Sequence, residues 1–395
     1  MRRTWVTLLA TTAVFGLLGS GVAEAGVGHR PDLRATLQQD ADSLLPYHAP
    51  GVLVGLDTNG RDIKVRSGYG NVDKKTPVPW NAKFRIGSNT KTFVSATLLQ
   101  LVGEGKLKLE DTVDHWLPGV VQGNGNDGTR ITVRQLLQHT SGLPEYLALT
   151  PYLFNQEGFE EHRFDTMTAD QAIALAMKQP PDFAPGTSWN YSNTNYMLAG
   201  MIINAVTGHT WQQEVQARII RPLGLRDTST PGTSPVVPRP HAVGYERFPG
   251  PDATEDDPQY GPAIDATLLN PSWGGAAGEM ISTTDDDNRF LKALIGGKVL
   301  RPAQLAEMQR TVPTNAEFEH NWPGVRYGLG LMWVPNSCGG SWSHGGDIHG
   351  FKTRNGVSPD GNRSVIVSIN TDSMDPAPAA DLTLPLIDHA LCGAR

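Results

Sequence analysis

The sequence predicts an α/β protein of the α+β type, in which one antiparallel sheet is flanked by helices and a mostly helical region is inserted between the two halves of the sheet. Two strand-like runs near the N-terminus, residues 51–56 and 62–66, are joined across an Asn-Gly pair, which is a strong hairpin signal. Strand-like runs return in the last third, at residues 327–334, 340–344 and 364–369, separated by turn-forming Asn, Gly and Pro residues. We therefore expect N- and C-terminal strands to form one sheet, with a cleft between the sheet and the helical region.

Helical periodicity accounts for most of the remaining elements. Thr132 is a good N-cap for the apolar run that follows it, and Gly103 and Gly208 follow helical patterns as helix-ending glycines. Phe84 and Arg85 are expected to form a short strand that leads into the helix beginning near Ser88. The expected helices span residues 32–44, 88–102, 132–137, 197–206 and 382–391.

The first 25 residues resemble an export signal. Arg2 and Arg3 precede an uncharged apolar run, residues 8–22, and Ala23-Glu24-Ala25 supplies a small-x-small cleavage site. Because this run is shorter than the roughly 20 residues that span a bilayer, we expect a signal peptide at 1–25 rather than a membrane anchor. The mature protein is then expected to be secreted and extracellular, with no membrane span after signal removal.

The remaining chain is expected to be one domain, residues 26–395. Its sheet region would comprise about 32–87 and 275–395, and its helical region about 88–274. The chain has 395 residues, of which 39% are hydrophobic and 18% are charged, which is typical of a globular protein with a large core. Its formal net charge of -7 argues against nucleic acid and anionic membranes as partners.

The residues Ser88-Asn89-Thr90-Lys91 provide the main chemical motif. Positions three apart on a helix share a face, so the Ser88 hydroxyl and the Lys91 amine would lie side by side. A serine needs a neighbouring base to become a nucleophile, and a desolvated lysine can lose its proton near neutral pH. The motif occurs once in the chain, and a solvated helix start is the alternative explanation when it is taken alone.

Other candidate motifs are weaker. Residues 123–128 match a Gly-x-Gly-x-x-Gly spacing but do not leave a strand in a βαβ unit, so we interpret them as a loop and expect no dinucleotide cofactor. His139 follows an apolar helix and is expected to be a buried, hydrogen-bonded structural histidine. His344 and His349 form the one close histidine pair near the expected cleft, without a ligand cluster, so no metal site is predicted.

The two cysteines, Cys338 and Cys392, both lie late in the chain. In an exported protein such a pair most simply forms a disulfide, here tying the C-terminal tail to a strand. Free or catalytic thiols are the alternative.

Several motifs in order resemble the penicillin-recognising active-site-serine hydrolases. These are Ser88-Asn89-Thr90-Lys91, then Tyr191-Ser192-Asn193, then His344-Gly345-Gly346, in a chain that also contains Phe183-Ala184-Pro185-Gly186 and His139-Thr140-Ser141-Gly142-Leu143. The resemblance covers nearly the whole mature chain. It is strongest to class C β-lactamase-like proteins and, among these, to exported actinomycete D-alanyl-D-alanine carboxypeptidases, which also have a late cysteine pair.

The resemblance implies a β-lactamase/transpeptidase-like fold and a role for each motif residue. Ser88 would attack the carbonyl carbon and form the acyl-enzyme, with Lys91 as its base or as the group that holds the base ready. Tyr191 would relay the proton to the leaving group, and Asn193 would bond both Lys91 and the substrate. His344 would lie close to the Tyr191 oxygen and lower the cost of a phenolate there.

The resemblance also implies a substrate-binding set. The oxyanion hole would be made by the backbone N–H groups of Ser88 and Asp347, and Gly345 and Gly346 would let the backbone approach the substrate. Trp273, preceded by Ser272 as in the carboxypeptidases, and Met332 are the other expected substrate-binding residues.

This sequence departs from the carboxypeptidase pattern where that pattern holds the substrate carboxylate. The family's strand Arg and two Thr are replaced here by Met332, Gly345 and Asp347. Asp347 would repel an anion. Lys352 or Arg354, on the following strand, is the residue that would replace the missing Arg as partner of the substrate carboxylate. Substrates with a blocked, extended or cationic end should therefore be better tolerated than free acids.

The expected function is that of a secreted serine hydrolase that forms an acyl-enzyme on D-amino-acid peptides, like a D-alanyl-D-alanine carboxypeptidase. The alternatives are a D-stereospecific amino- or endopeptidase or a family VIII-type esterase, followed by a β-lactamase. The alternative that is not an enzyme is a non-catalytic penicillin-binding protein. Such a protein would be expected to lack Ser88, Lys91 or Tyr191, and all three are present. The expected substrate is a small D-amino-acid peptide, ester or β-lactam, with no cofactor.

Overall fold

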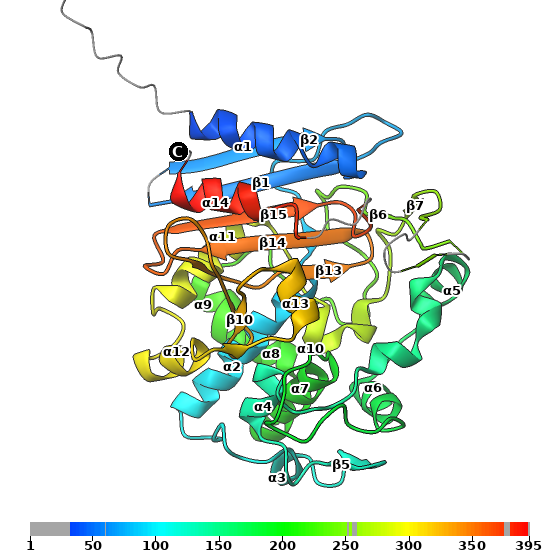
Figure 1. Ribbon diagram of the computed structural model, residues 1–395, viewed down its shortest axis with the longest axis vertical. Coiled ribbons are helices and arrows are strands. Elements are labelled where there is room, and N and C mark those ends of the chain that lie inside the picture. Colours follow the sequence, from blue (N-terminus) through cyan, green and yellow to red (C-terminus); the bar gives the residue numbers. More distant parts are fainter. Residues whose placement is uncertain (1–31, 60, 251–252, 255–258, 375–379, 394–395) are drawn as a thin grey trace, which may run out of the picture. The chain divides into compact units, whose positions relative to one another are not determined.

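An antiparallel sheet occupies one side of the protein and is built from both ends of the chain (Figure 1). The computed structural model describes residues 32–59, 61–250, 253–254, 259–374 and 380–393. The predicted signal peptide therefore lies outside the described residues. Within them the strand order is β2-β1-β15-β14-β12-β11-β10-β9, with β13 also paired to β14. The bounds are β1 (Gly51–Thr58), β2 (Arg61–Gly68), β9 (Val312–Pro313), β10 (Arg326–Tyr327), β11 (Met332–Val334), β12 (Ser341–Ser343), β13 (Gly346–Ile348), β14 (Phe351–Val357) and β15 (Arg363–Ile369).

The first and last strands of the chain pair with each other within this sheet, as the sequence predicted. Strand β1 pairs with β2 in the expected hairpin, in which Val54 lies opposite Val65, and on its other side it pairs with β15, in which Val54 lies opposite Val367. All three valines are nearly completely buried. A central strand covered on both faces favours such a continuous apolar run over a strict alternation. The mixed α/β architecture with an antiparallel sheet confirms the predicted fold class.

Helices cover both faces of this sheet. Helices α1 (Leu33–Asp42) and α14 (Leu384–Cys392) pack side by side on β2 and β15, while α11 (Thr284–Ile295) packs against β1, β14 and β15 (Figure 1). Leu37 and Leu386 belong to the apolar core under the first pair, and Phe290 and Leu294 are buried beneath α11. The sheet is thereby held rigidly at the edge where the site is assembled.

The helical half of the protein centres on two long helices, α2 (Thr90–Gly103) and α7 (Thr194–Thr207), which pack against each other. Helix α7 ends at Gly208 in the left-handed conformation, and α4 begins at a Thr132 capping box, both as predicted. The remaining helices are α3 (Val113–Trp116), α4 (Val133–Gln138), α5 (Gln156–His162), α6 (Ala169–Ala176), α8 (Trp211–Val215), α9 (Arg221–Leu223), α10 (Gly275–Gly278), α12 (Pro302–Met308) and α13 (Ala316–Asn321).

Several short elements complete the fold. Strand β3 (Phe84–Arg85) pairs with β8 (Ile281–Ser282), which places the nucleophile motif beside the segment that precedes α11. The other short elements are β4 (Gln122–Gly123), β5 (Asn126–Asp127), β6 (Tyr245–Glu246), β7 (Ile264–Asp265), η1 (Leu45–Tyr47), η2 (Gly87–Asn89), η3 (Tyr146–Leu149), η4 (Pro151–Phe154), η5 (Gln216–Ile220) and η6 (Pro271–Trp273).

Two predictions of local structure were wrong. The run 327–334 was predicted as one strand, but it folds back on itself as β10 and β11, because Gly330 adopts a positive φ of 67°. A Cβ atom on Gly330 would lie 2.3 Å from Ser95 Oγ, so this turn docks directly onto α2. The Gly-rich segment 123–128 was predicted as a loop, and it instead carries part of the small β4–β5 hairpin.

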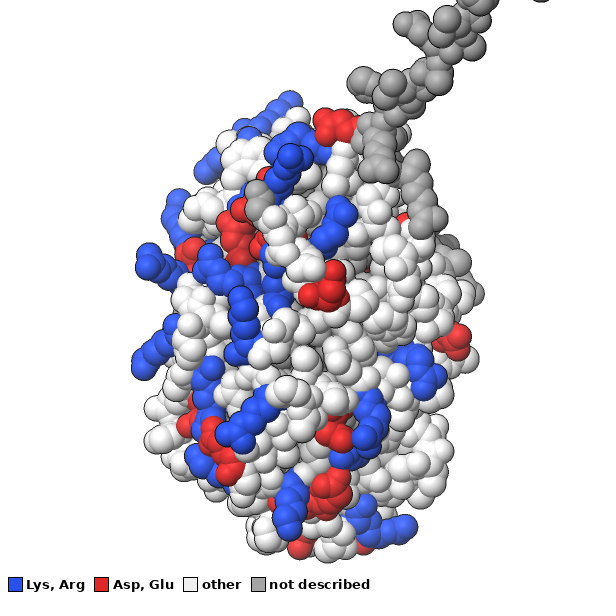
Figure 2. Space-filling model, turned by 90° about the vertical axis from the view of Figure 1, so that its left-hand side faces the viewer, with Lys and Arg blue, Asp and Glu red and all other residues white. Residues whose placement is uncertain are grey.

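The C-terminus is tied down by the predicted disulfide, which joins Cys338, between β11 and β12, to Cys392 at the end of α14. No helix in the described part of the chain has the length and apolarity needed to cross a bilayer. On the face shown in Figure 2, acidic side chains interrupt the Lys and Arg side chains. The ion pairs of Arg134 with Glu110 and Glu307 show how such charges pair at the surface.

Candidate active site

Ser88 lies in a tight turn between the sheet and the helical half. It belongs to the 3-10 turn η2, which follows β3 and runs directly into α2, so the predicted single helix begins with a 3-10 turn. Ile86 N donates to Met280 O at 3.0 Å, and Gly87 takes a positive φ of 51°. Ser88 is partly exposed whereas Lys91 is completely buried. A reactive hydroxyl is thus presented to a substrate while its neighbouring amine is kept from water.

Lys91 Nζ has three oxygen neighbours. It lies 2.9 Å from Ser88 Oγ, 2.7 Å from Asn193 Oδ1 and 2.8 Å from the carbonyl oxygen of Ala277. Burial lowers the pKa of Lys91 to about 7, against the opposing fields of Glu145 and Asp347. A neutral amine has two protons and one lone pair. With the two carbonyl oxygens accepting the protons, the lone pair is left for the Ser88 hydroxyl proton.

Tyr191 lies on the other side of the nucleophile. Burial is the larger effect on the pKa of Tyr191 and raises it well above its usual value, although the Ser88 side chain beside the phenol lowers it. The Lys91 ammonium nitrogen lies 4.8 Å from the centre of the Tyr191 ring. Tyr191 therefore keeps its proton near neutral pH, which suits a group that donates a proton to a departing amine.

Glu145 is a residue of this site that the sequence reasoning missed. Its Oε2 accepts hydrogen bonds from Asn193 N at 2.6 Å and Asn193 Nδ2 at 3.0 Å, so it fixes the amide whose oxygen holds Lys91. Burial raises the pKa of Glu145. Its position directly after the Gly142-Leu143-Pro144 turn, which returns the chain toward the cleft, is the signal that could have identified it.

His344 is placed differently from the prediction. It was expected to act on the Tyr191 oxygen, but its Nε2 accepts a hydrogen bond from the Tyr327 hydroxyl at 2.8 Å, and its Nδ1 donates to the carbonyl oxygen of Gly345 at 2.8 Å. Burial, reinforced by the charge of Lys91, lowers the pKa of His344 to about 3. At neutral pH the imidazole is therefore neutral, and its two ring nitrogens are paired with Tyr327 and Gly345 instead of Tyr191.

The backbone segments assigned to the oxyanion hole lie against each other. A Cβ atom on Gly346 would lie 1.9 Å from Ile86 O and 2.8 Å from Ser88 N, and one on Gly87 would lie 2.7 Å from Asp347 N. Any larger side chain at these two glycines would push β13 away from the nucleophile turn. The amide groups of Ser88 and Asp347 thus come from adjoining segments, as an oxyanion hole requires. Gly345 lies on the far side of this contact, where a Cβ would lie 3.1 Å from Arg354 Nη1.

Lys352 and Arg354, the cations considered as partners of a substrate carboxylate, already form ion pairs with carboxylates of the protein. Arg354 contacts Asp347 at 2.9 Å and also pairs with Asp381, while Lys352 lies 3.4 Å from Asp347 and 3.5 Å from Asp372. Burial opposes ionisation of Asp347, but Arg354 and Lys352 together hold its pKa below the usual range. Burial and the charge of Asp347 raise the pKa of Asp372 well above its usual value. Asp347 and Asp381 thus supply the carboxylates that pair with Arg354 and Lys352.

The other two predicted substrate-binding residues, Met332 and Trp273, have different surroundings from each other. Met332 is 2% exposed and packs with Tyr327 and Trp189 in a small apolar cluster, so it offers no polar contact. Trp273 is partly exposed, and the Tyr146 hydroxyl donates a hydrogen bond to its carbonyl oxygen.

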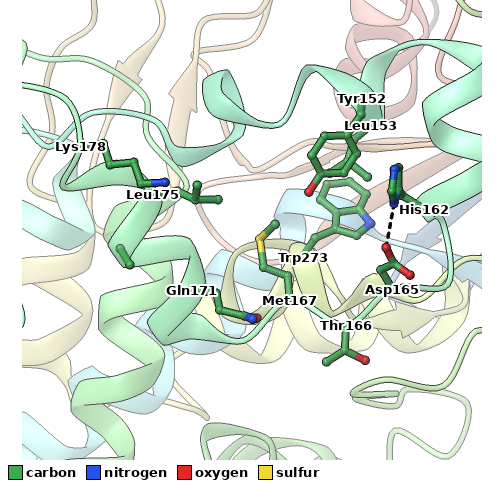
Figure 3. Close-up of a pocket in the computed structure, with 11 residues that line it drawn as sticks. Tyr152, Leu153, His162, Asp165, Thr166, Met167, Gln171, Leu175, Lys178 and Trp273 are labelled. Carbon is green, nitrogen blue, oxygen red and sulfur yellow. Dashed lines mark hydrogen bonds and ion pairs between the residues drawn. The ribbon is translucent and has the colours of Figure 1, made fainter.

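The Trp273 ring lines a cavity of about 370 Å³ together with Tyr152, Met167 and the hydrogen-bonded pair His162–Asp165 (Figure 3). In that view the indole lies beside the Tyr152 ring and the His162 imidazole, with Met167 and Gln171 on the neighbouring side. The cavity is therefore walled by aromatic and apolar groups and carries polar groups among them.

His139 has the structural role predicted for it. It is completely buried, and its Nδ1 lies 3.2 Å from Ser192 N and 3.0 Å from Asn195 Nδ2, so it holds the segment between Tyr191 and α7. Among the residues that the structure describes, no group of three His, Cys, Asp or Glu side chains is arranged to hold a metal ion.

The geometry brings together a nucleophile, a base, a proton donor and paired backbone amides. Ser88 Oγ can add to a carbonyl carbon as its proton passes to Lys91, while the negative oxygen that forms is met by the adjoining amides. Tyr191 is placed to protonate the leaving group.

Comparison with known proteins agrees with this arrangement. The family model described as Beta-lactamase matches residues 33–387. Protein flp of Staphylococcus aureus (strain MW2) is 26% identical over 344 residues, which cover 85% of this chain and 64% of that protein. The chain thus spans less than two thirds of that relative's length.

Two solved structures are also similar over most of the chain. A D-stereospecific amidohydrolase from Streptomyces sp. has a TM-score of 0.81 and 41% identity, covering 92% of this chain and 100% of that one. The D-amino acid amidase from Ochrobactrum anthropi SV3, in complex with D-phenylalanine, has a TM-score of 0.77 and 27% identity, covering 92% and 98%. The family match, the fold and the Ser88–Lys91–Tyr191 geometry agree, and this chain belongs to the Beta-lactamase family as a β-lactamase-fold serine hydrolase.

Proposed function

We propose that this protein is a secreted, D-stereospecific serine amidohydrolase, which cleaves the amide or ester bond that follows a D-amino acid. The proposal takes up the D-peptidase alternative left open by the sequence, in place of a strict D-alanyl-D-alanine carboxypeptidase. Secretion is part of the proposal and rests on the signal-like segment 1–25.

One observation carries the substrate assignment, namely that Lys352 and Arg354 are neutralised by Asp347 and Asp381. A carboxylate on the leaving-group side would have to compete with these carboxylates for the two cations, and Met332 offers it no hydrogen bond. A carboxamide, an ester or a continuing peptide carries no such charge. The likeness to the Streptomyces D-stereospecific amidohydrolase, at 41% identity, supports the same substrate class.

In the proposed reaction, Ser88 Oγ forms a bond to the substrate carbonyl carbon while its proton passes to Lys91 Nζ. The carbon–nitrogen bond then breaks, and the departing amine takes a proton from Tyr191, which is in turn reprotonated from Lys91. Water then adds to the acyl carbon as its proton passes to Lys91 Nζ, and the carbon–oxygen bond to Ser88 breaks as Lys91 returns that proton to Ser88 Oγ, which releases the acid.

The test compares four substrates on the purified protein: D-phenylalanine amide, L-phenylalanine amide, an N-acyl-D-Ala-D-Ala free acid and its C-terminal amide. We expect the D-amide and the blocked peptide to be cleaved well and the free acid poorly, with all activity lost in Ser88→Ala. A higher kcat/KM for the free acid than for its amide would reject the proposal and favour the carboxypeptidase. Intact mass after incubation with benzylpenicillin would report separately whether Ser88 forms a β-lactam adduct.

A further inference from the structure

A buried carboxyl group outside the reacting set is hydrogen-bonded to the nucleophile turn. Asp287 lies in the first turn of α11 and is completely buried. None of the described Lys, Arg or His side chains forms an ion pair with it, and burial raises its pKa to about 7. A carboxyl group held at this cost away from any cation calls for an explanation, because an apolar residue there would avoid the desolvation penalty.

On one side Asp287 holds the nucleophile turn. Its Oδ2 accepts a hydrogen bond of 2.7 Å from the amide nitrogen Nδ2 of Asn89, which directly follows Ser88 and is itself completely buried. Because Asn89 and Ser88 share the short turn η2, a bond that fixes the Asn89 side chain also limits movement of the Ser88 backbone.

On its other side Asp287 lies near Asn355 of β14, which, like Asn89, lowers the pKa of Asp287 against the effect of burial. The other oxygen of this carboxyl group, Oδ1, is buried and makes no hydrogen bond with the described residues. Asn355 in turn brackets the backbone of His344, since its Oδ1 accepts from His344 N at 2.9 Å and its Nδ2 donates to His344 O at 2.9 Å. Asp347, the second oxyanion residue, lies three positions further along the chain.

We propose that Asp287 is a positioning residue, which fixes the Ser88 amide relative to the Asp347 amide through its hydrogen bond to Asn89. It does not touch the reacting atoms. The inference rests on the proposed role of Ser88 as the nucleophile, but not on the D-amide substrate. Its physical basis is that an oxyanion hole works only when both donors are held in place before the negative charge forms.

The test measures how fast Ser88 is acylated in Asp287→Ala and Asp287→Asn. The readouts are the rate of covalent labelling by a fluorophosphonate, followed by intact mass, and kcat and KM for a p-nitrophenyl ester. We expect Asp287→Ala to label about 10- to 100-fold more slowly and to lose kcat with KM unchanged. Asp287→Asn, which keeps an acceptor oxygen for Asn89, should recover most of the rate.

Asp286→Ala is the matched control. Asp286 is 5% exposed and sits on the same turn of α11, but its carboxylate accepts from Asp227 N and Thr228 Oγ1 instead of the nucleophile turn. It should alter the melting temperature without slowing acylation per folded molecule. An equal loss in Asp286→Ala, or an unchanged rate in folded Asp287→Ala, would overturn the inference.

If Asp287→Ala does not fold, a double-mutant cycle between Asn89→Ala and Asp287→Leu, which fills a similar volume but has no acceptor for Asn89, decides the matter. Loss in the double variant should equal the loss in Asn89→Ala alone, because both changes act on one bond, and additive losses would reject the assignment. Failure of the D-amide substrate with normal ester cleavage would reject the proposed function only. An unlabelled wild-type protein would reject both.

Discussion

Lys91 Nζ lies 2.9 Å from Ser88 Oγ, with its two other acceptors supplied by Asn193 and the backbone of Ala277. These contacts orient the amine toward Ser88, so the fold itself determines that the Ser88 proton passes to Lys91. The acceptors come from three separate segments, so the amine cannot turn away from the serine without losing two hydrogen bonds. Reactivity of Ser88 should therefore follow the protonation state of Lys91.

We expect kcat/KM to rise with pH along a single ionisation near pH 7. The pKa of Lys91 is lowered to about 7, so the amine is protonated and has no lone pair below that pH, and is free to accept the serine proton above it. The measurement is a pH profile from 5 to 9 on the amide substrate. Lys91→Arg, which stays protonated throughout, should lower kcat/KM by about 10²- to 10⁴-fold. A flat profile across pH 7 would show that another group is the base.

Glu145→Gln should act in two ways. Loss of the negative charge removes a field that raises the pKa of Lys91, so the pH at half-maximal kcat/KM should move below that of the wild type. The Gln side chain also has one acceptor oxygen instead of two, so it cannot accept from both Leu147 N and the Asn193 donors, and we expect kcat to fall by about 10-fold. Glu157→Gln, an exposed change on α5, serves as the control and should leave both quantities unchanged. A profile that stays at the wild-type position would contradict the assigned coupling.

His344 should stay neutral across the physiological range. Its pKa is lowered to about 3, chiefly by burial, and its Nε2 accepts from the Tyr327 hydroxyl. Nitrogen NMR of the labelled protein should show one unchanging tautomer, protonated at Nδ1, between pH 5 and 8.

Tyr327→Phe provides the companion variant. It removes the donor to Nε2 and should destabilise the fold by about 1 to 3 kcal/mol, as expected for an unsatisfied buried acceptor. A titration of His344 in this pH range in the wild type would restore the charged role first predicted for it.

Asp347→Asn should change which substrates are accepted. With this carboxylate removed, one N–H group of Arg354 loses its partner and can meet a substrate carboxylate. We expect the ratio of kcat/KM for the free-acid peptide over its amide to rise by about 10-fold, the value of one charge-assisted hydrogen bond. Asp381→Asn, which frees Arg354 on the side away from Asp347, is the comparison. No change in the ratio would mean that substrate carboxylates do not reach this cluster.

Removal of the disulfide should affect stability alone. Cys338 and Cys392 are 54 residues apart, and closing a loop of that length contributes about 4 kcal/mol to the free energy of unfolding in the chain-entropy description. Cys338→Ser with Cys392→Ser should therefore lower the denaturation midpoint while leaving kcat and KM unchanged. A fall in kcat of the folded variant would show that the bond also supports the site.

Much of the fold and of the reacting pair could be predicted from the sequence because it depends on local spacing. Ser88 and Lys91 are three residues apart and share one turn, so their contact follows from backbone geometry. The β1–β2 hairpin and the caps at Thr132 and Gly208 are likewise set by neighbouring residues. The turn at Gly330 escaped prediction because an apolar run interrupted by glycines fits one strand as well as two.

The tertiary structure alone decided what surrounds that pair. His344 meets Tyr327 instead of Tyr191, Glu145 reaches Asn193 across 48 positions, and Asp287 meets Asn89 across 198. Such partners depend on how sheet and helices pack, and burial then sets which groups carry charge. The sequence by itself therefore determined which reacting groups this protein carries, and the packing decided the protonation states and the ion pairs on which the proposed choice of substrate depends.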